Sequence, residues 1–312
     1  MGGFATVWLY HDAELRSDVA VKALAENWAQ RLDVRERFLE EARILRQADS
    51  DHIVRVYDIG EADGTPYFVM TYADLGSLAD VLERERVLPT ASVLDLVAQA
   101  GAGLSVLHEH GVVHRDIKPQ NLLLRSGGSA GPRLLVADLG VAKAMLHASG
   151  LTQVVGTPAY MAPEQAVGVG IDIRADVHAL GAVTYQMLTG SLARTGSIGE
   201  LARATLPARP SSLADLSSAV DDVLLRALEP DPEDRWPDVA SYVAALRAAL
   251  PSQVPGVEDQ LTLWHVPDRR GAAGTELATP APRGPLWPTV LISLLAFVVA
   301  FALAYVAATT LR

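Results

Sequence analysis

Two polar segments in the middle of the chain constrain its fold and chemistry more than any other feature. Residues 114–121 read His-Arg-Asp-Ile-Lys-Pro-Gln-Asn, and residues 138–140 read Asp-Leu-Gly. The Asp116 carboxylate can accept a proton from a hydroxyl, and the Lys118 ammonium can neutralise a phosphoryl group in transfer. Asn121 and Asp138 supply oxygen atoms of the kind that bind Mg²⁺. Together these two residues could hold Mg²⁺ on opposite sides of a triphosphate.

These segments resemble the catalytic loop and the metal-binding turn of eukaryotic-type (Hanks-type) protein kinases. Lysine two residues after the aspartate, followed by Pro119, is the form seen in the serine/threonine kinases of that family. The resemblance implies that Asp116 orients a substrate hydroxyl and that Lys118 offsets the transferring charge. It also implies that Asn121 and Asp138 hold Mg²⁺, for which Mn²⁺ could substitute.

The sequence before the catalytic loop carries the family's lysine and glutamate in the expected order. Residues 19–22 read Val-Ala-Val-Lys, which favours a strand, and Glu41 lies in a stretch of helix-forming composition. The resemblance implies that Lys22 binds the α- and β-phosphates of ATP and pairs with Glu41. Glu40 is the alternative partner. Glu41 is preferred because the family has an apolar residue one turn beyond the glutamate, where this chain has Leu45.

Three further family motifs follow the metal-binding turn. Residues 156–164 read Gly-Thr-Pro-Ala-Tyr-Met-Ala-Pro-Glu and resemble the segment that receives the substrate's hydroxyl residue. Thr157 in this segment is expected to hydrogen-bond the catalytic aspartate and lysine. Asp176 opens Asp-Val-His-Ala-Leu-Gly, which matches the family's Asp-Val-Trp-Ser-Leu-Gly helix with two substitutions. Arg235 is the expected buried partner of Glu164. The resemblance covers residues 1 to about 250. Any one of these motifs could occur by chance, but their occurrence together in the family's order is very specific.

The resemblance implies an α+β, bilobal protein-kinase fold with a small β-rich lobe and a large helical lobe. ATP would lie between the lobes, with its adenine between Ala20 and Leu123 and backbone contacts near residues 71–73. Met70 occupies the family's gatekeeper position, and Leu45, Val56, His114 and Leu139 match its apolar column between the lobes. The full set expected around the nucleotide is Gly2, Gly3, Val7, Ala20, Lys22, Glu41, Met70, Thr71, Ala73, Leu123, Asn121 and Asp138.

Apolar periodicity and chain-breaking residues predict the order of the elements. Two strands are expected within residues 4–24, and two more at 53–60 and 66–72. Helices are expected at 33–47, 77–84, 90–110, 174–189, 215–228 and 237–249. Residues 251–285 are rich in proline, glycine, alanine and charge without a clear period, which indicates a juxtamembrane linker.

The beginning of the chain departs from the family pattern. The family's glycine-rich loop reads Gly-x-Gly-x-x-Gly-x-Val, whereas this chain opens Met-Gly-Gly-Phe-Ala-Thr-Val. Alignment on Val7 places Gly2 at the second glycine and Ala5 at the third, so the first glycine and the strand before it have no counterpart. We expect the natural protein to begin upstream of Met1. The alternative is an impaired nucleotide lid.

Residues 286–308 form an overwhelmingly apolar run without charge. A helix of this length spans a hydrocarbon core of about 30 Å, which predicts a transmembrane helix rather than a buried core helix. Arg269, Arg270 and Arg283 precede the run and only Arg312 follows it. The positive-inside rule then places the kinase domain in the cytoplasm and residues 309–312 outside, as a single-pass cell-membrane protein.

Small residues and hydroxyls suggest two regulatory features. Ala296, Ala300, Ala304 and Ala308 recur every fourth residue, so the apolar helix presents a face on which two copies could pair as a homodimer. Thr152, and second Ser149, are the candidate phosphorylation sites in the segment before Thr157. The Arg115 side chain could pair with a phosphate at Thr152.

Composition excludes several other classes of function. A net charge of −11 argues against a nucleic-acid-binding surface, and zero cysteines exclude disulfides, thiolate zinc sites and a cysteine nucleophile. The resemblance implies a non-specific serine/threonine protein kinase that phosphorylates proteins, including itself. A membrane pseudokinase scaffold is the first alternative, motivated by the broken glycine loop. A small-molecule phosphotransferase of related fold is the second, although the 156–164 segment favours a protein substrate.

Overall fold

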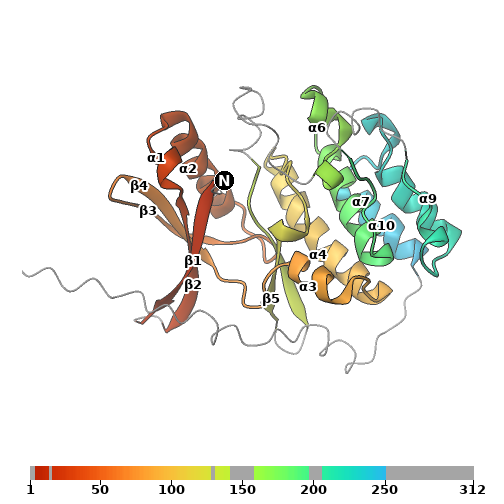
Figure 1. The fold of residues 1–312 in the computed structure, drawn as a ribbon, viewed down its shortest axis with the longest axis horizontal. Helices are drawn as coiled ribbons and strands as arrows, with labels where there is room; N and C mark the ends of the chain where they lie inside the picture. The colour runs from red at the N-terminus through yellow and green to blue at the C-terminus, as the bar shows by residue number, and fades with distance from the viewer. Residues whose placement is uncertain (1–3, 14–15, 128–130, 141–157, 197–205, 251–312) are drawn as a thin grey trace, which may run out of the picture. The chain divides into compact units, whose positions relative to one another are not determined.

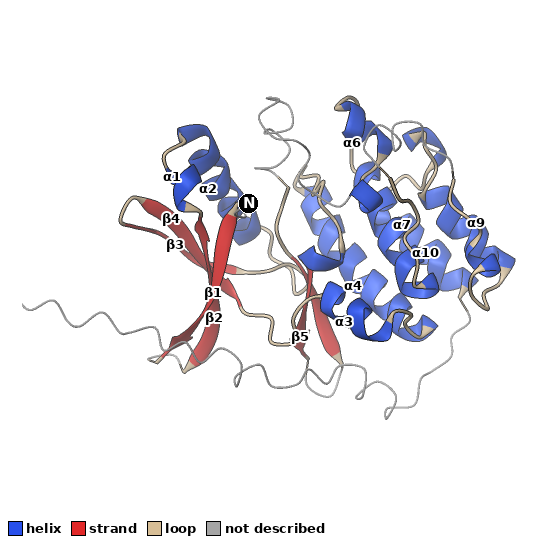
Figure 2. Ribbon diagram, viewed as in Figure 1, coloured by secondary structure: helices blue, strands red, loops and turns tan. Residues whose placement is uncertain are grey.

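The computed structural model describes residues 4–13, 16–127, 131–140, 158–196 and 206–250. These residues all belong to one structural unit, Met1–Val266. Within this unit the strands of the first third gather in one lobe, and most of the helices form another (Figures 1 and 2). The predicted bilobal α+β fold is thereby confirmed. The predicted linker and transmembrane segment, 251–308, lie outside the described residues.

The small lobe is a four-stranded antiparallel sheet with two helices. The strands run in the spatial order β1 (Ala5–Asp12), β2 (Ser17–Leu24), β4 (Thr65–Thr71) and β3 (Val56–Ala62). The helices are α1 (Glu26–Ala29) and α2 (Leu32–Gln47). Buried residues on α2 recur at helical spacing, and Phe38 packs on Phe68 of β4 with ring centroids 5.0 Å apart. This contact fixes α2 against the sheet.

Strand β1 lies at one end of this sheet. Its register with β2 places Val7 opposite Lys22. Within the described residues β1 pairs with β2 only, and its four central apolar residues, Val7 to Tyr10, are each roughly half exposed. Its interior therefore lacks the alternation of buried and exposed residues that strands with one covered face show.

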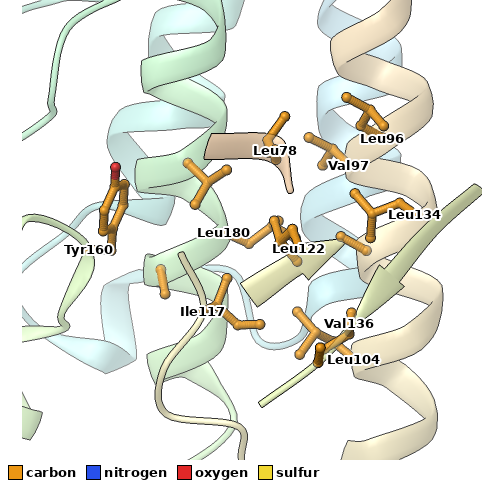
Figure 3. Packing of buried hydrophobic residues seen from close by; sticks show 14 of the residues in the cluster. Leu78, Leu96, Val97, Leu104, Ile117, Leu122, Leu134, Val136, Tyr160 and Leu180 are labelled. Carbon is orange, nitrogen blue, oxygen red and sulfur yellow. The ribbon is translucent and has the colours of Figure 1, made fainter. Parts of the chain in front are cut away.

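The large lobe is built on helices, most of which contribute to one apolar core (Figure 3). They are α3 (Leu78–Glu85), α4 (Thr90–Glu109), α6 (Pro163–Val167), α7 (Arg174–Thr189), α9 (Ser218–Ala227) and α10 (Val239–Ala249). Among the described residues, short 3₁₀ turns lie between these helices at Pro119–Asn121, Pro158–Tyr160, Pro210–Ser212 and Pro232–Asp234. Almost every residue of α7 is buried, which makes it the central helix of the lobe.

Local sequence explains where several of these helices begin. Ser77 and Asp80 form a capping box at the start of α3, in which each side chain bonds the other residue's backbone. Asp238 caps α10 by accepting a hydrogen bond from the Ser241 backbone at 2.7 Å. The six helices predicted from periodicity are all present, with ends shifted by at most three residues in α9.

A short hairpin lies between the motif segments. Strands β5 (Leu122–Ser126) and β6 (Pro132–Val136) pair antiparallel, with Leu122 opposite Val136. Sequence analysis assigned no strand or helix here, because apolar runs of three and four residues are too short to separate strand from loop. The correction matters for the site, since Asn121 directly precedes β5 and Asp138 follows β6 by two residues.

One described helix, α4, is long and apolar enough to cross a membrane by length and composition. It packs against β6, α7 and α10, and half of its most apolar window is buried there. These contacts are those of a core helix of the large lobe.

Candidate active site

Lys22 joins three elements of the fold through its ammonium group. Strand β2 carries Lys22, helix α2 carries Glu41, and Asp138 follows β6. The Lys22 Nζ atom lies 2.7 Å from Glu41 Oε1 and 2.7 Å from Asp138 Oδ1. Glu40, the alternative considered from the sequence, instead contacts Arg43 at 3.1 Å on the exposed side of α2. Glu41 is therefore the glutamate that holds Lys22.

The electrostatics of this triad keep the lysine charged. Burial alone would lower the pKa of Lys22, because it disfavours the charged ammonium. The negative charges of Glu41 and Asp138 outweigh that effect and raise the pKa well above its ordinary value. The ammonium is therefore fixed in position and fully protonated. Asp138 is 43% exposed, so this side of the triad is open to a ligand.

A second polar cluster forms in the catalytic-loop segment. Lys118 Nζ lies 3.1 Å from both carboxylate oxygens of Asp116. Asn121 Nδ2 donates to the Asp116 carbonyl at 2.7 Å and to Asp116 Oδ2 at 2.9 Å. The Asp116 carboxylate is thereby held from two sides, while 19% of its side chain remains exposed to accept a substrate group.

Asp176 at the start of α7 holds the backbone of this loop through hydrogen bonds to its N–H groups. Its carboxylate, completely buried, accepts from the His114 N–H at 2.8 Å and the Arg115 N–H at 2.9 Å. Arg115 has φ of 66°, in the left-handed region that costs energy for a side-chain-bearing residue. The two bonds to Asp176 hold this strained turn immediately before the catalytic aspartate.

His114 ties the catalytic loop to the metal-binding turn. Its Nδ1 accepts from the Asp116 N–H at 3.3 Å, so Nε2 carries the proton and donates to the Ala137 carbonyl at 3.0 Å. Burial lowers the pKa of His114, which keeps the ring neutral despite nearby carboxylates. Gly140 donates to the His114 carbonyl at 3.0 Å, and an added Cβ there would come within 2.9 Å of that oxygen. The chain passes too close to this carbonyl for a side chain, which explains why residue 140 is glycine.

Sequence analysis did not foresee two supporting residues. His108, near the end of α4, places Nε2 2.8 Å from Asp176 Oδ2. Gln165 donates to the Arg115 carbonyl at 2.8 Å. These partners lie 68 and 50 positions away in the sequence, so no local pattern could have joined them.

The residues expected around the nucleotide come from elements of both lobes. Ala20 and Met70 are buried neighbours in the pairing of β2 with β4, and Thr71 ends β4. Leu123 lies in β5 and bridges to Ser77. The proposed apolar column, Leu45, Val56, His114 and Leu139, is buried throughout. Gly2, Gly3, Ser149, Thr152 and Thr157 lie outside the described residues.

The expected Glu164–Arg235 pair is present in the large lobe. Arg235 Nη1 and Nη2 each lie 2.7 Å from one oxygen of Glu164, which is a bidentate pair. The remaining N–H groups donate to the carbonyls of Arg174, Glu229 and Pro230. The guanidinium therefore connects α6, the start of α7 and the turn after α9.

The donor set fits a magnesium ion that is shared with a phosphate ligand. Both side-chain bonds of Asn121 use Nδ2, so Oδ1, the atom a metal would take, is not engaged in them. No group of three or more histidine or carboxylate side chains arranged for a metal occurs among the described residues. Two oxygen ligands suffice for Mg²⁺, because this ion keeps several waters and binds phosphate oxygens.

Comparison with known protein families agrees with this geometry. Residues 1–244 match the family described as "Protein kinase domain". The chain therefore belongs to the protein kinase family.

Within that family, the similar proteins are bacterial serine/threonine kinases. Serine/threonine-protein kinase PknJ of Mycobacterium tuberculosis is 33% identical over 307 residues, covering 92% of this chain and 52% of that protein. Serine/threonine-protein kinases drp72 of Corynebacterium efficiens is 37% identical over 306 residues, covering 93% and 58%. The chain thus spans about half the length of these relatives. The crystal structure of the Mycobacterium tuberculosis PknI kinase domain aligns with a TM-score of 0.64 at 28% identity, covering 80% of this chain and 93% of that one.

Proposed function

We propose that this chain transfers the γ-phosphate of ATP to serine and threonine hydroxyls of proteins, including its own. The observation that carries the proposal is the assembled triad in which Lys22 contacts Glu41 and Asp138 at 2.7 Å each. A module that only bound partners would have no need of a buried, charged lysine directed at an exposed carboxylate.

In this proposal, residues of both lobes form the ATP site. The adenine would lie between Ala20 and Leu123, with backbone contacts near residues 71–73, and Val7 on β1 would cover it. The Lys22 ammonium would contact the α- and β-phosphates, held in place by Glu41. Asn121 and Asp138 would hold Mg²⁺, which supplies charge neutralisation for the phosphates when it is bound.

Transfer then depends on positioning and charge, because phosphoryl transfer leaves the protein little covalent chemistry to perform. The Asp116 carboxylate accepts the hydroxyl hydrogen bond and orients its oxygen in line with the γ-phosphate. The Lys118 ammonium, 3.1 Å from that carboxylate, offsets charge on the transferring group. The hydrogen bond from Asn121 Nδ2 to Asp116 Oδ2 helps to keep the carboxylate in this orientation.

The proposal includes a place in the cell. The apolar run 286–308 would anchor the chain once through the cell membrane, with the kinase domain on the cytoplasmic face and residues 251–285 as a linker. Self-phosphorylation would act on Thr152, and second on Ser149, in the segment before Thr157. Pairing of two anchors along their alanine face would bring two kinase domains together for transfer between copies.

A radiolabelled-ATP assay on the full chain in detergent tests the activity. We expect label on the chain itself and on a serine/threonine-containing substrate protein. Asp116→Asn should reduce transfer by roughly 10³-fold or more, while ATP affinity stays within about twofold, because Asp116 meets the hydroxyl and not the nucleotide. Transfer by Asp116→Asn near the wild-type rate would contradict the mechanism. Nucleotide binding without any transfer in the wild-type chain would favour the pseudokinase alternative.

A further inference from the structure

An aromatic contact holds the start of strand β1. Phe4, which directly precedes β1, stacks on Trp28 of α1 with ring centroids 4.7 Å apart and 20° between the ring planes. Both side chains are partly buried and pack against the apolar core. The central residues of β1, Val7 to Tyr10, are by contrast each roughly half exposed. Stacking of this kind is favourable beyond the area that the rings bury, so Phe4 is an anchoring residue for its strand.

The backbone of Phe4 is fixed by the same part of the fold. The Ala25 N–H donates to the Phe4 carbonyl at 3.1 Å, one step beyond the pairing of Ala5 with Leu24. Ala25 is also the residue from which α1 starts, and its carbonyl accepts from the Trp28 N–H at 2.8 Å. The first turn of α1 therefore holds both the backbone and the ring of Phe4.

Trp28 also contacts the start of the helix that carries Glu41. The Arg31 N–H donates to the Trp28 carbonyl at 3.0 Å, and α2 begins at the next residue. The Arg31 guanidinium lies over the Trp28 ring, 5.9 Å from its centroid. Farther along α2, the Glu41 carboxylate contacts Lys22. Trp28 thus joins the start of β1 to the element that positions the phosphate-binding lysine.

The place of Phe4 in the sequence relates this anchor to the nucleotide. Phe4 follows Gly2 and Gly3 and comes three residues before Val7, and all three are among the residues proposed for the ATP site. Strand pairing holds Val7 opposite Lys22. The end of a strand opens more readily than its middle. An anchor at this end, present before the ligand arrives, reduces the ordering that ATP binding has to impose.

We propose that Phe4 and Trp28 are positioning residues for ATP. Their stack holds the start of β1 in the arrangement that the triphosphate requires, and so raises the affinity for ATP. The contact acts on binding and not on transfer, because Asp116 and Lys118, which act in transfer, belong to another part of the chain. The inference rests on the proposed function, since it assigns two further residues to the same ATP site.

Nucleotide binding by the full chain in detergent tests the inference without requiring transfer. The probe is AMP-PNP, a non-hydrolysable ATP analogue, with Mg²⁺, in isothermal titration calorimetry. We expect Phe4→Leu and Trp28→Leu each to weaken AMP-PNP binding by roughly 3–10-fold, the range that a lost aromatic stack allows. The double variant should bind about as well as the weaker single variant, because the second change removes a contact that is already lost.

Adenosine separates the phosphates from the rest of the nucleotide. It should bind Phe4→Leu and Trp28→Leu within about twofold of the wild-type affinity, measured by competition with a fluorescent nucleotide, because Val7 stays paired with Lys22. A general loosening of the small lobe would weaken adenosine and AMP-PNP binding alike. Equal losses for the two ligands would therefore overturn the inference.

Two matched variants assign the effect to the stack. Trp28→Phe keeps an aromatic ring against Phe4 and should retain AMP-PNP affinity within about threefold. Trp8→Leu removes a tryptophan from the centre of β1, where it is 47% exposed, and should change that affinity by less than about twofold. A loss in Trp8→Leu as large as in Trp28→Leu would overturn the inference. If Trp28→Leu does not fold, Phe4→Leu and Trp28→Phe decide.

Kinetics distinguishes this inference from the proposed function. In Phe4→Leu the KM for ATP should rise by about the same 3–10-fold, while kcat changes by less than about twofold. Wild-type affinity for AMP-PNP in both leucine variants would overturn the inference and leave the kinase proposal intact. The expected binding losses in a chain that transfers no phosphate would contradict the kinase proposal and support the anchor. A wild-type chain that binds no AMP-PNP would contradict both.

Discussion

Two buried ion pairs in this molecule have the same nitrogen–oxygen distance but very different surroundings. Lys22 meets Glu41, and Arg235 meets Glu164, each at 2.7 Å. Every donor of Arg235 is used, in two bonds to the carboxylate and three to carbonyls of the turns around it. Lys22 has instead two carboxylate contacts, and the second of these, Asp138, is 43% exposed.

The difference reflects the chemistry of the two cations. A guanidinium presents a rigid fork of donors that can join several backbone segments at fixed angles. An ammonium is a compact charge on a flexible stem, so its contacts can be exchanged for phosphate oxygens without moving the backbone. One pair therefore stabilises the fold, while the other holds a charge ready for a ligand. The following predictions test this division, beginning with the largest expected effect.

Arg235→Met should lower the free energy of unfolding by about 3–5 kcal/mol, because it leaves the Glu164 carboxylate and three carbonyls without their partner. Denaturant unfolding measures this loss. Arg209→Met is the matched control, since its side chain is 63% exposed and its contact with Asp221 is a long 3.7 Å; we expect a change under about 1 kcal/mol there. Similar losses in the two variants would remove the structural role assigned to Arg235.

Lys22→Met should act on transfer more than on folding. We expect kcat/KM for ATP to fall by on the order of 10²–10³-fold, about 3–4 kcal/mol of transition-state stabilisation, because the phosphates lose a fixed charge. The loss of unfolding free energy should be smaller than in Arg235→Met, since Glu41 can take up a proton when its partner is gone. Kinetics and denaturant unfolding on the same preparations separate the two effects. A stability loss equal to that of Arg235→Met would erase the contrast between the pairs.

Glu41→Gln and Glu40→Gln form a matched pair on adjacent positions of α2. Glu41→Gln should reduce kcat/KM by about tenfold, near 1.4 kcal/mol, because the amide holds Lys22 less firmly than the carboxylate does. Glu40→Gln should change the rate by less than about twofold, since Glu40 makes only a surface contact with Arg43. Steady-state kinetics at varied ATP concentration checks both. Equal effects would mean that the helix surface, and not the buried pair, controls Lys22.

His178 should make the large lobe sensitive to acid. Its folded-state pKa lies well below the ordinary value of 6.5, so below about pH 6.5 the unfolded chain binds a proton that the folded chain does not. Stability therefore falls as pH falls, by at most about 1.4 kcal/mol per pH unit from this group. Denaturant unfolding at pH 5.5 and 6.5 should show a shallower dependence of stability on pH in His178→Trp than in the wild-type chain. An equally steep dependence in the variant would exclude His178 as the source.

Much of this architecture could be read from local patterns. Helix α7 was predicted at 174–189, the range the structure has, because breakers flank a long apolar segment, with Gly190 in the left-handed conformation as its end. The residues of the catalytic loop were identifiable because Asp116, Lys118 and Asn121 lie within six positions and their chemistry needs this proximity. The choice of Glu41 over Glu40 also rested on local spacing, and the structure agrees with it.

Contacts between distant segments were beyond the sequence alone. The β5–β6 hairpin was missed because its strands are stabilised by pairing and by the core beneath them more than by their own short apolar runs. His108 reaches Asp176 only because α4 packs beside α7. The residues themselves, their order and their helical periods were therefore determined by the sequence, since those signals act within a few residues. Which polar groups meet in the interior, as His108 and Asp176 do, was decided only when packing brought distant segments out of water together.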